Sequence, residues 1–327
     1  MNLAQVLLGV CVVAVVSFAA LAGEGARVQP LAPPDAATLW LDLARNDADR
    51  WVVVGGNAER QPGALFTSDD AGAHWTRRDH PALHRLYGVT FATPERAIAV
   101  GLGGTILLGA EGGAKWRCVH QRDGCWLAGV AFATAERGFA VGHQGDAAAV
   151  LLQSEDGGET WRDHASLPTS ARTATLRAIS FRDAEHGAIA GTGGTLLSTT
   201  DGGRTWSVGA TLGDDYLRAI AWRGDELFVV GGAGVVARSR DGGATVERVA
   251  FAAGDKLNAI DFLDAEHGLI ATMGGVLWST ADGGATWQRA ATDAEGAHLT
   301  AITVAEDPGK AYVVGDGRFW RVVSRDP

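Results

Sequence analysis

The sequence is poor in cysteine, proline, methionine and tyrosine: its 327 residues include 3 Cys, 9 Pro, 2 Met and 3 Tyr. So few cysteines exclude a small scaffold built from disulfides. Sparse proline excludes a proline-rich disordered chain, although 45 glycines make glycine roughly twice as frequent as usual. Basic residues are also in deficit, because 28 Lys and Arg face 38 Asp and Glu and leave a formal net charge of −10. We therefore expect no nucleic-acid partner.

Long apolar runs are absent except at the N-terminus, and no segment after residue 30 shows a long helical period. Residues 3–22, LAQVLLGVCVVAVVSFAALA, carry no charge. A run of about 20 residues fits a membrane span, while Ala20-Leu21-Ala22 before Gly23 fits a signal-peptidase site. The sequence leaves residues 1–22 open between a cleaved signal peptide and a retained anchor. Both predict export, so we expect a periplasmic or extracytoplasmic protein, with residues 3–22 as its inner-membrane tether if they are kept.

Two cysteines lie outside that run, Cys118 and Cys125 in WRCVHQRDGCW. An even number of cysteines in an exported chain favours a disulfide between them, which would pin one connecting loop. A zinc site would need further ligands at metal spacing, and only His120 stands nearby. We predict the disulfide and no metal site.

One octapeptide recurs along the chain. TTDGGRTW (residues 199–206) returns as SDDAGAHW, GAEGGAKW, SEDGGETW, SRDGGATV and TADGGATW. The spacings between successive acidic positions are 41, 45, 45, 40 and 41 residues. These positions are Asp70, Glu111, Asp156, Asp201, Asp241 and Asp282. Repeats of about 40–45 residues indicate an array of supersecondary units.

Each repeat reads as four short strands separated by turns rich in Gly and Asp. The first strand follows the pattern LxAIxF, the second reads AIAG or YVVG, and the octapeptide connects the third strand to the fourth. Six repeats with the octapeptide and a seventh without it, LTAITVAEDPGKAYVVGDGRFWRVV, predict an all-β, seven-bladed β-propeller with four-stranded antiparallel blades over residues 38–327. The seventh repeat lacks its outer strand. We expect residues 23–37, a linker, to supply it and close the ring.

The acidic octapeptides are interpreted as structural. Their Asp can accept backbone hydrogen bonds across the turn, the glycines permit positive φ, and the Trp can pack between sheets. A catalytic residue is normally unique, whereas this one occurs in almost every repeat. No lysine follows the glycines as in a phosphate-binding loop, and each turn has too few carboxylates for calcium. We expect no cofactor.

The octapeptide matches the Asp box, or bacterial neuraminidase repeat, Ser/Thr-x-Asp-x-Gly-x-x-Trp. The larger unit, as in FLDAEHGLIATMGGVLWSTADGGATW, resembles the photosystem II assembly/stability factor family of seven-bladed propellers over roughly residues 39–323. That resemblance implies a non-catalytic protein that binds a subunit of a membrane complex and acts as an assembly factor or scaffold. We therefore expect a membrane-protein or envelope-complex partner, and a monomer when the protein is alone.

The face opposite the Asp boxes is the candidate binding face, because the position after the repeated Leu of the first strand varies there. It holds Tyr87, Ala128, Arg177, Arg218, Asn258 and Thr300. The resembled family has an arginine-rich patch on this side that is implicated in partner binding. The candidate partner-binding residues are Arg85, Tyr87, Arg172, Arg177 and Arg218. The alternative is that each arginine pairs with an acidic loop such as Asp214-Asp215.

A second function remains open, because Asp boxes also occur in sialidases and other glycoside hydrolases. A sialidase-like site needs an arginine triad, a Tyr nucleophile with a Glu, and an acid/base. The best cluster for this is Tyr216, beside Asp214-Asp215 and Arg218. No early arginine motif of that kind is visible. We predict a non-catalytic protein and keep the glycoside hydrolase as the alternative.

Overall fold

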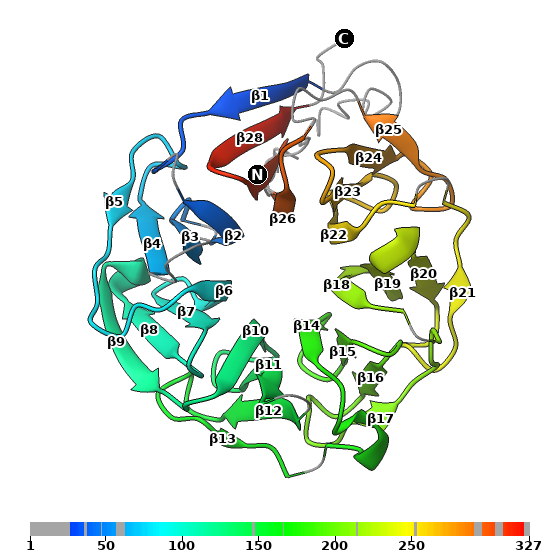
Figure 1. Cartoon of the computed structure of the whole chain (residues 1–327), viewed down its shortest axis with the longest axis horizontal. Helices are drawn as coiled ribbons and strands as arrows, with labels where there is room; N and C mark the ends of the chain where they lie inside the picture. The colour runs from blue at the N-terminus through cyan, green and yellow to red at the C-terminus, as the bar shows by residue number, and fades with distance from the viewer. Residues whose placement is uncertain are drawn as a thin grey trace, which may run out of the picture.

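The computed structural model describes residues 27–323, except 36–37, 47, 57–62, 146–147, 166, 214, 252–253, 291–295 and 305–309. Over these residues, 28 strands form seven four-stranded antiparallel sheets set around a ring (Figure 1). The predicted seven-bladed β-propeller is confirmed. The expected signal or anchor, residues 1–22, lies outside the described residues. No helix in the described part of the chain is long and apolar enough to cross a membrane.

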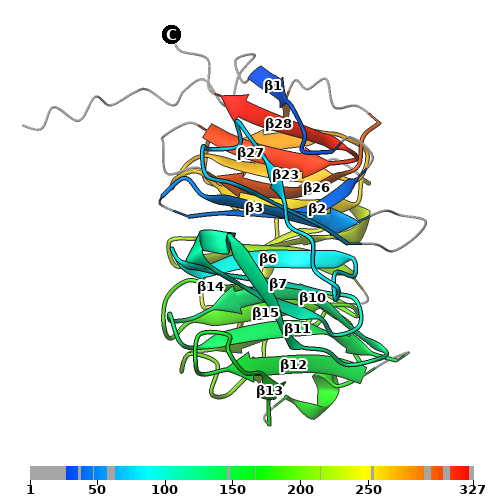
Figure 2. The ribbon, with the colours of Figure 1, turned by 90° about the vertical axis from the view of Figure 1, so that its left-hand side faces the viewer.

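In blades 1 to 6 the four strands follow one another in sequence from the ring axis outward, and in blade 7 the outermost strand is β1 (Figures 1 and 2). The innermost strands are β2 (Leu39–Arg45), β6 (Leu86–Thr93), β10 (Cys125–Phe132), β14 (Leu176–Phe181), β18 (Leu217–Arg223), β22 (Leu257–Phe262) and β26 (Leu299–Val304). The second strands are β3 (Trp51–Gly56), β7 (Arg96–Gly101), β11 (Gly138–Gln144), β15 (Gly187–Gly191), β19 (Glu226–Gly231), β23 (Gly268–Thr272) and β27 (Lys310–Gly315). Blades 1 to 7 are numbered by their innermost strands in this order.

The outer half of each blade is shorter. The third strands are β4 (Gly63–Ser68), β8 (Ile106–Ala110), β12 (Ala148–Ser154), β16 (Leu196–Thr199), β20 (Val236–Ser239), β24 (Leu277–Thr280) and β28 (Arg318–Val323). The outermost strands are β5 (Thr76–Arg77), β9 (Lys115–His120), β13 (Arg162–Asp163), β17 (Ser207–Val208), β21 (Glu247–Arg248), β25 (Gln288–Ala290) and β1 (Arg27–Leu31). Three 3-10 turns complete the described elements: η2 (Glu111–Gly113), η3 (Thr169–Ala171) and η4 (Gly232–Gly234).

The antiparallel order of the strands separates two faces of the ring. First and third strands of a blade run in the same direction, so the Asp boxes that follow the third strands lie at the end where the innermost strands finish. We call this the box face. The innermost strands begin at the opposite face, which therefore carries the variable residues that follow the repeated Leu.

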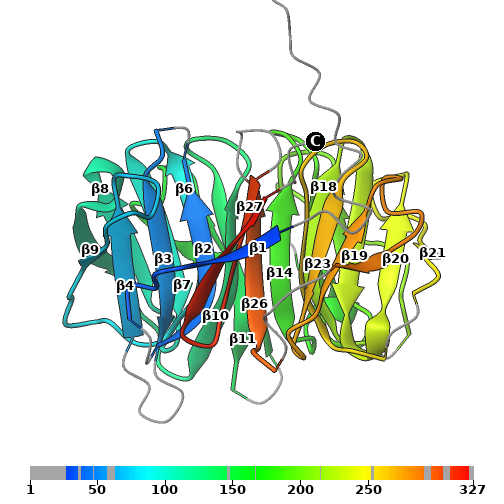
Figure 3. The same ribbon diagram turned by 90° about the horizontal axis from the view of Figure 1, so that it is seen from above.

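Blade 7 receives its outer strand from the N-terminal stretch. β1 pairs antiparallel with β28, beside which it lies in Figures 1 and 2, and its register runs from Arg27 opposite Val323 to Leu31 opposite Phe319. In Figure 3, β1 lies on the side of the ring that faces the viewer. Gln29 and Arg321 add a side-chain hydrogen bond of 2.7 Å across this pair. The strand that the seventh repeat lacks thus comes from within residues 23–37, and the first and last blades are held together.

The hydrophobic core lies between blades rather than inside them. One cluster joins Trp40 and Trp51 of blade 1 to Val314 and Phe319 of blade 7. Another joins Phe139 of blade 3 to blade 4, where the box residue Trp206 packs edge-on against Phe139 with ring centroids 5.9 Å apart. Burial of each large side chain contributes about 1.5–3 kcal/mol, so each box Trp fastens its blade to the preceding one.

Small residues let the innermost strands approach one another at the axis. The third position of the LxAIxF pattern is Gly or Ala in six blades, and a Cβ on Gly88 would lie 3.1 Å from the Ala128 carbonyl oxygen of the next blade. Blade 1 has Asp42 here instead. Its two carboxylate oxygens accept hydrogen bonds of 2.9 Å from the backbone N–H groups of Leu43 and Val89, so Asp42 links blade 1 to blade 2.

Asp42 predicts a pH-dependent stability. Loss of hydration in the channel wall raises the pKa of its carboxyl to about 7, although backbone hydrogen bonds from Val89 and Leu43 oppose the rise. Because the folded pKa lies above the ordinary 3.8, this contribution is complete below pH 3.8 and is lost as pH rises through 7. The residue keeps part of its surface open to the channel. Water there reduces the effect, and we expect roughly 1–2 kcal/mol.

The measurement is chemical unfolding of the wild type and of Asp42→Asn at pH 4.5 and pH 7.5. The wild type should gain about 1–2 kcal/mol relative to the variant at the lower pH. Effects of titrating histidines are common to both proteins and cancel in the difference. Asp123→Asn, at an exposed carboxylate, is the matched control. An equal difference at both pH values would contradict the role given to Asp42.

The Asp boxes are closed by a repeated set of hydrogen bonds. In blade 4, the Asp201 carboxylate accepts bonds from the Thr199 hydroxyl (2.8 Å), the Thr205 backbone N–H (2.9 Å) and the Thr205 hydroxyl (2.6 Å). The Thr199 oxygen also accepts the Gly203 N–H at 2.9 Å. The same turn forms around Asp70, Asp156, Asp241 and Asp282. The carboxylates serve these turns.

Glu111 is the exception among the acidic box positions. Its carboxylate accepts a bond of 2.6 Å from the Lys115 ammonium, and its backbone enters η2 with φ 55°. The box of blade 2 has Gly109 where the others have Ser or Thr, and the extra methylene of Glu carries its carboxylate toward solvent. The structural role predicted for Glu111 therefore differs in kind from that of the five Asp residues.

This difference gives a test of the turn. Asp201→Ala should lower the free energy of unfolding by about 1–2 kcal/mol, because three hydrogen bonds are lost and the Thr205 N–H loses its acceptor. Glu111→Ala, which removes only an exposed ion pair, should cost less than about 0.5 kcal/mol. Urea denaturation of both variants measures the effect. Equal costs would show that the Asp201 carboxylate does not hold the turn.

The predicted disulfide is wrong for this structure, because Cys118 and Cys125 are both free thiols. Cys118 lies on the outer strand β9 and packs toward the cluster between blades 1 and 2. Cys125 opens the innermost strand β10 and is buried in the cluster between blades 2 and 3. The Cys118 thiol donates instead to the His120 carbonyl oxygen, at 3.4 Å. Although only a few residues separate them in sequence, Cys118 lies on the outermost strand of blade 2 and Cys125 on the innermost strand of blade 3.

Candidate functional site

The mouth of the central channel, on the face opposite the Asp boxes, is a cavity of about 250 Å³. Along each innermost strand the repeated Leu is buried between blades, and the next side chain points the other way, into the channel. The cavity walls therefore come from equivalent positions of many blades. Its lining residues are Leu39, Leu41, Tyr87, Trp126, Ala128, Arg177, Arg218, Asn258, Met273, His298 and Thr300.

Aromatic rings and guanidinium groups alternate across this channel mouth. The Arg177 guanidinium carbon lies 4.5 Å from the Trp126 ring centroid and 5.1 Å from that of Tyr216. The Arg218 guanidinium lies 4.8 Å from the Tyr216 ring. Tyr87 extends the row, because its ring meets Trp126 edge-on with centroids 5.0 Å apart. The aromatic faces hold both arginines by cation–π attraction.

Neither Arg177 nor Arg218 pairs with a carboxylate among the residues that the structure describes. Arg218 donates to the Asn258 side-chain oxygen at 3.0 Å, and Asn258 donates to the Leu299 carbonyl at 2.7 Å. Burial lowers the pKa of the Arg177 guanidinium, and the nearby charge of Arg218 acts in the same direction. The positive charges of Arg177 and Arg218 thus lie close together, and they are held by aromatic rings and by the Asn258 side-chain amide.

The acidic loop weighed as a partner for these arginines has other contacts. The Asp215 carboxylate pairs with Arg248, and Asp214 lies outside the described residues. Two buried donors at the mouth also have no acceptor within the described part of the chain, the Arg218 Nε–H and the Trp126 indole N–H. The two guanidinium charges, which no described carboxylate neutralises, favour an incoming group that carries negative charge and accepts hydrogen bonds.

His143 adds to this environment from the turn end of β11. Its ring lies 4.8 Å from Trp126, and its pKa is lowered by burial and by the charge of Arg177. Near neutral pH it therefore adds little positive charge. The cationic character of the mouth comes from the two arginines.

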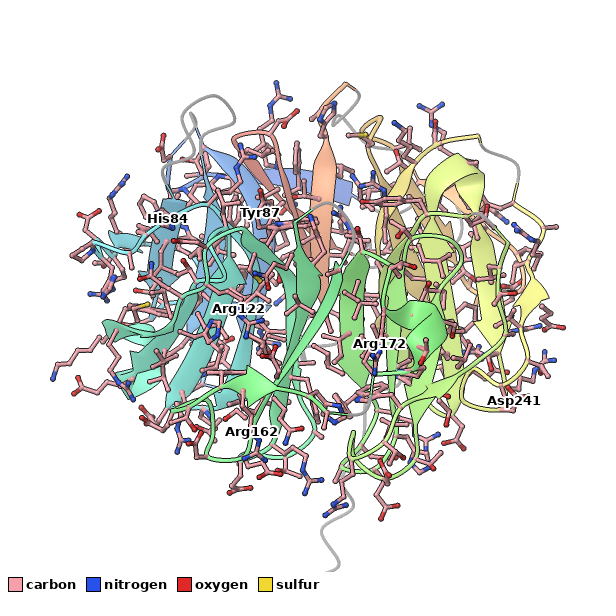
Figure 4. All side chains as sticks on the ribbon, turned by 60° about the horizontal axis from the view of Figure 1, so that its bottom comes forward. His84, Tyr87, Arg122, Arg162, Arg172 and Asp241 are labelled. Atoms are coloured by element: carbon pink, nitrogen blue, oxygen red, sulfur yellow. The ribbon has the colours of Figure 1, made fainter. Side chains whose placement is uncertain are left out.

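The five candidate binding residues divide in two. Tyr87, Arg177 and Arg218 meet at the channel mouth as expected from their position after the repeated Leu. Arg172 caps η3, where its Nε donates to the Leu167 carbonyl, and Figure 4 shows it well separated from Tyr87. Arg85 precedes the repeated Leu and does not line the cavity.

Trp126 and Tyr216, the rings that sandwich Arg177, were not expected as binding residues. Each stands one residue before the repeated Leu, at Leu127 and Leu217. Because side chains alternate along a strand, the residue before the repeated Leu and the residue after it point to the same side of the strand. That spacing was a usable signal, although only the fold shows which rings meet which arginine.

Residues needed for hydrolysis do not assemble at the mouth. Its lining residues include no Asp or Glu, so the described cavity lacks the carboxylate pair used by most glycosidases. Tyr216, the candidate nucleophile, is held between Arg177 and Arg218. Within the described residues, no group of three His, Cys, Asp or Glu side chains is arranged to hold a metal ion.

Comparisons with known proteins agree with this architecture. The family model described as photosynthesis system II assembly factor YCF48 matches residues 108–207 and 163–322, which together span more than half of the chain. No curated protein matches the sequence.

Several solved structures share the fold. A structure described as YCF48 bound to D1 peptide has 17% identity and a TM-score of 0.71, covering 93% of this chain and 99% of that one. YCF48 from Cyanidioschyzon merolae has 18% identity and a TM-score of 0.69, covering 91% and 98%. A catalytically inactive virginiamycin B lyase from Staphylococcus aureus with quinupristin has 11% identity and a TM-score of 0.76, covering 91% and 99%. The same fold therefore accompanies both a peptide-bound assembly factor and a lyase, so fold alone does not decide function.

Proposed function

The chain belongs to the photosynthesis system II assembly factor YCF48 family, and we propose that it is a non-catalytic binding protein for a subunit of a membrane complex. In this proposal it acts outside the cytoplasm, as a monomer, during assembly or stabilisation of that complex. The partner contributes an extended peptide segment with acidic side chains. The observation that carries the proposal is the pair Arg177 and Arg218, which lack carboxylate partners among the described residues and stand between aromatic rings.

The geometry suits such a segment for three reasons. The mouth is a shallow cavity of about 250 Å³, which accommodates a few side chains rather than a folded domain. Trp126, Tyr216 and Arg177 are residue types that commonly anchor interfaces. The Arg177 and Arg218 guanidinium groups line the cavity and pair with no described carboxylate, so they offer charge-assisted hydrogen bonds to carboxylate or carbonyl oxygens.

The relatives support the proposal at the level of ligand class. The structure described as YCF48 bound to D1 peptide shows that a propeller of this family takes a peptide. The family is described as an assembly factor of photosynthesis system II. For this chain we propose, as the binding partner, a membrane protein complex of its own host. The apolar residues 3–22 support export, either as a cleaved signal or as a tether.

Affinity capture tests the proposal. Tagged protein is recovered from gently solubilised membranes of the source cells, and co-purifying proteins are identified by mass spectrometry. We expect one membrane complex to be recovered consistently. The same preparation is assayed against aryl glycosides, including a sialoside. Turnover of a glycoside by clean protein, without recovery of a membrane complex, would overturn the proposal in favour of the hydrolase.

A further inference from the structure

The seam between blades 4 and 5 holds two adjoining cavities on the box face. One, of about 530 Å³, opens at the box-face end of the channel beside Ser180 and Asp261. The other, of about 520 Å³, extends outward beside Ser198 and Ser207 to Arg240. Trp222 and Arg182 line both. The shared residues make them one groove, which we call the seam groove.

The core of this seam lacks two large side chains that the neighbouring seams have. In the seam before blade 4 the box Trp206 packs against Phe139, and in the seam before blade 6 Trp287 joins Phe228 in one cluster. In the seam before blade 5 the corresponding residues are Val246 and Ala188. A Trp–Phe contact in the neighbouring seams is thus replaced by Val and Ala in the core between blades 4 and 5.

The wall contributed by blade 4 is lined with short polar side chains. Strand register places Ser180, Ala188, Ser198 and Ser207 in one row across the four strands. The matching row of blade 3 is Ala131, Phe139, Gln153 and Arg162. The hydroxyls of Ser198 and Ser207 make no side-chain hydrogen bond within the described part of the chain. They remain available as donors and acceptors.

Both guanidinium groups in the groove are paired with carboxylates, in contrast to those at the channel mouth, and Asp241 and Asp261 also line it. Arg182 pairs with Asp183 at 3.0 Å and with Asp225 at 2.8 Å. Arg240 pairs with Glu226 at 2.9 Å and with Glu247 at 3.2 Å. Each guanidinium therefore meets two carboxylates. A phosphate or an acidic peptide would have to displace these carboxylates, so an uncharged ligand fits this groove better than an anion.

We propose that the seam groove binds an uncharged oligosaccharide. Trp222 lines both cavities, and the part of its indole that borders them can contact the apolar face of a sugar ring. The indole is held in place by the Arg182 guanidinium, whose carbon lies 5.6 Å from its ring centroid, and by a hydrogen bond of 3.4 Å from its Nε1–H to the Ser180 carbonyl. The serine hydroxyls and the ion-paired side chains supply short donors and acceptors on both walls. The cavity volumes lie within the range of small-molecule sites, at about 300–1,000 Å³.

Nuclear magnetic resonance with ¹⁵N-labelled protein tests this. The Trp222 indole signal is assigned by its loss in Trp222→Phe. Maltotetraose, cellotetraose and N-acetylchitotetraose are titrated separately, with inorganic phosphate and a polyglutamate peptide as charged probes. We expect saturable movement of the Trp222 signal by at least one oligosaccharide at about millimolar concentration, and none by the charged probes.

Filling the groove should abolish the binding. Ser198→Gln with Ser207→Arg copies the pair found at Gln153 and Arg162, and we expect at least a tenfold loss of affinity. Thr76→Arg, at the register position of blade 1 that matches Ser207, is the control and should bind as the wild type. Trp222→Phe copies the residue at Phe132, Phe181 and Phe262, so it should fold and bind several-fold more weakly.

Three outcomes would overturn the inference. These are no saturable shift with any oligosaccharide, unchanged binding by the filled variant, or a stronger response of Trp222 to phosphate or polyglutamate. The groove lies on the face opposite the channel mouth, so the result is independent of the proposed peptide binding. Loss of one activity leaves the other measurable in the same protein.

Discussion

A protein that begins at Ala32, without β1, is expected to unfold at a midpoint roughly 5–10 °C lower than the full ring and to self-associate. β1 supplies five register pairs to β28, the Gln29–Arg321 hydrogen bond, and Leu31 against the cluster of Trp40 and Phe319. Net hydrogen-bond and burial contributions of this kind amount to about 3–5 kcal/mol. The truncation also exposes the edge of β28, which can pair with another chain.

Calorimetry measures the midpoint, and light scattering after size exclusion measures association. A synthetic peptide covering residues 24–35, added in trans, should restore part of the midpoint, while a scrambled peptide should not. A truncated protein that stays monomeric and unfolds at the same midpoint temperature as the full chain would show that β1 does not close the ring.

Charge reversal at the channel mouth is expected to cause a large loss of affinity for the membrane subunit. Arg177→Glu with Arg218→Glu should weaken binding of the captured membrane subunit by about a hundredfold or more, since two anchoring cations become repulsive. The wild-type side chains stand 4.5–5.1 Å from the Trp126 and Tyr216 rings, so the variant loses the cation–π contacts too. Biolayer interferometry with peptides from the captured subunit gives the affinities.

Arg172→Glu is the matched control, because Arg172 caps η3 and contributes nothing to the mouth lining. It reverses one charge on the same protein, where the double variant reverses two. We expect its affinity within about twofold of the wild type. Binding of the double variant at wild-type strength, with unchanged circular dichroism, would remove Arg177 and Arg218 from the interface.

The fold could be predicted from sequence because each repeat encodes its turn locally. The Asp, the glycines and the Ser or Thr of TTDGGRTW form their hydrogen bonds within the octapeptide, so the sequence pattern alone predicts the turn. The missing strand of blade 7 was also visible as an incomplete repeat. The cysteine pairing was not, since sequence spacing cannot show that Cys118 and Cys125 face different inter-blade cores.

The channel mouth could be predicted only in part. Tyr87, Arg177 and Arg218 follow from one position of the repeat, while the contacts of Arg177 with Trp126 and Tyr216 join three blades and depend on ring geometry. The sequence shows that the box of blade 5 ends in Val246 instead of Trp. It does not show that Ala188 of the preceding blade packs in the same core cluster, which only the structure reveals. The sequence predicts a structural role for the Asp boxes, and the seam groove lies beside the box of blade 5.

Site-specific photo-crosslinking in cells tests the central claim most directly. A benzophenone amino acid replaces Ala128, at the channel mouth, or Asp69, exposed on the box face. We expect that the Ala128 position crosslinks to a membrane-protein subunit, that the Asp69 position does not, and that Arg177→Glu with Arg218→Glu abolishes the product. A membrane-protein crosslink from Asp69 with none from Ala128 would contradict it.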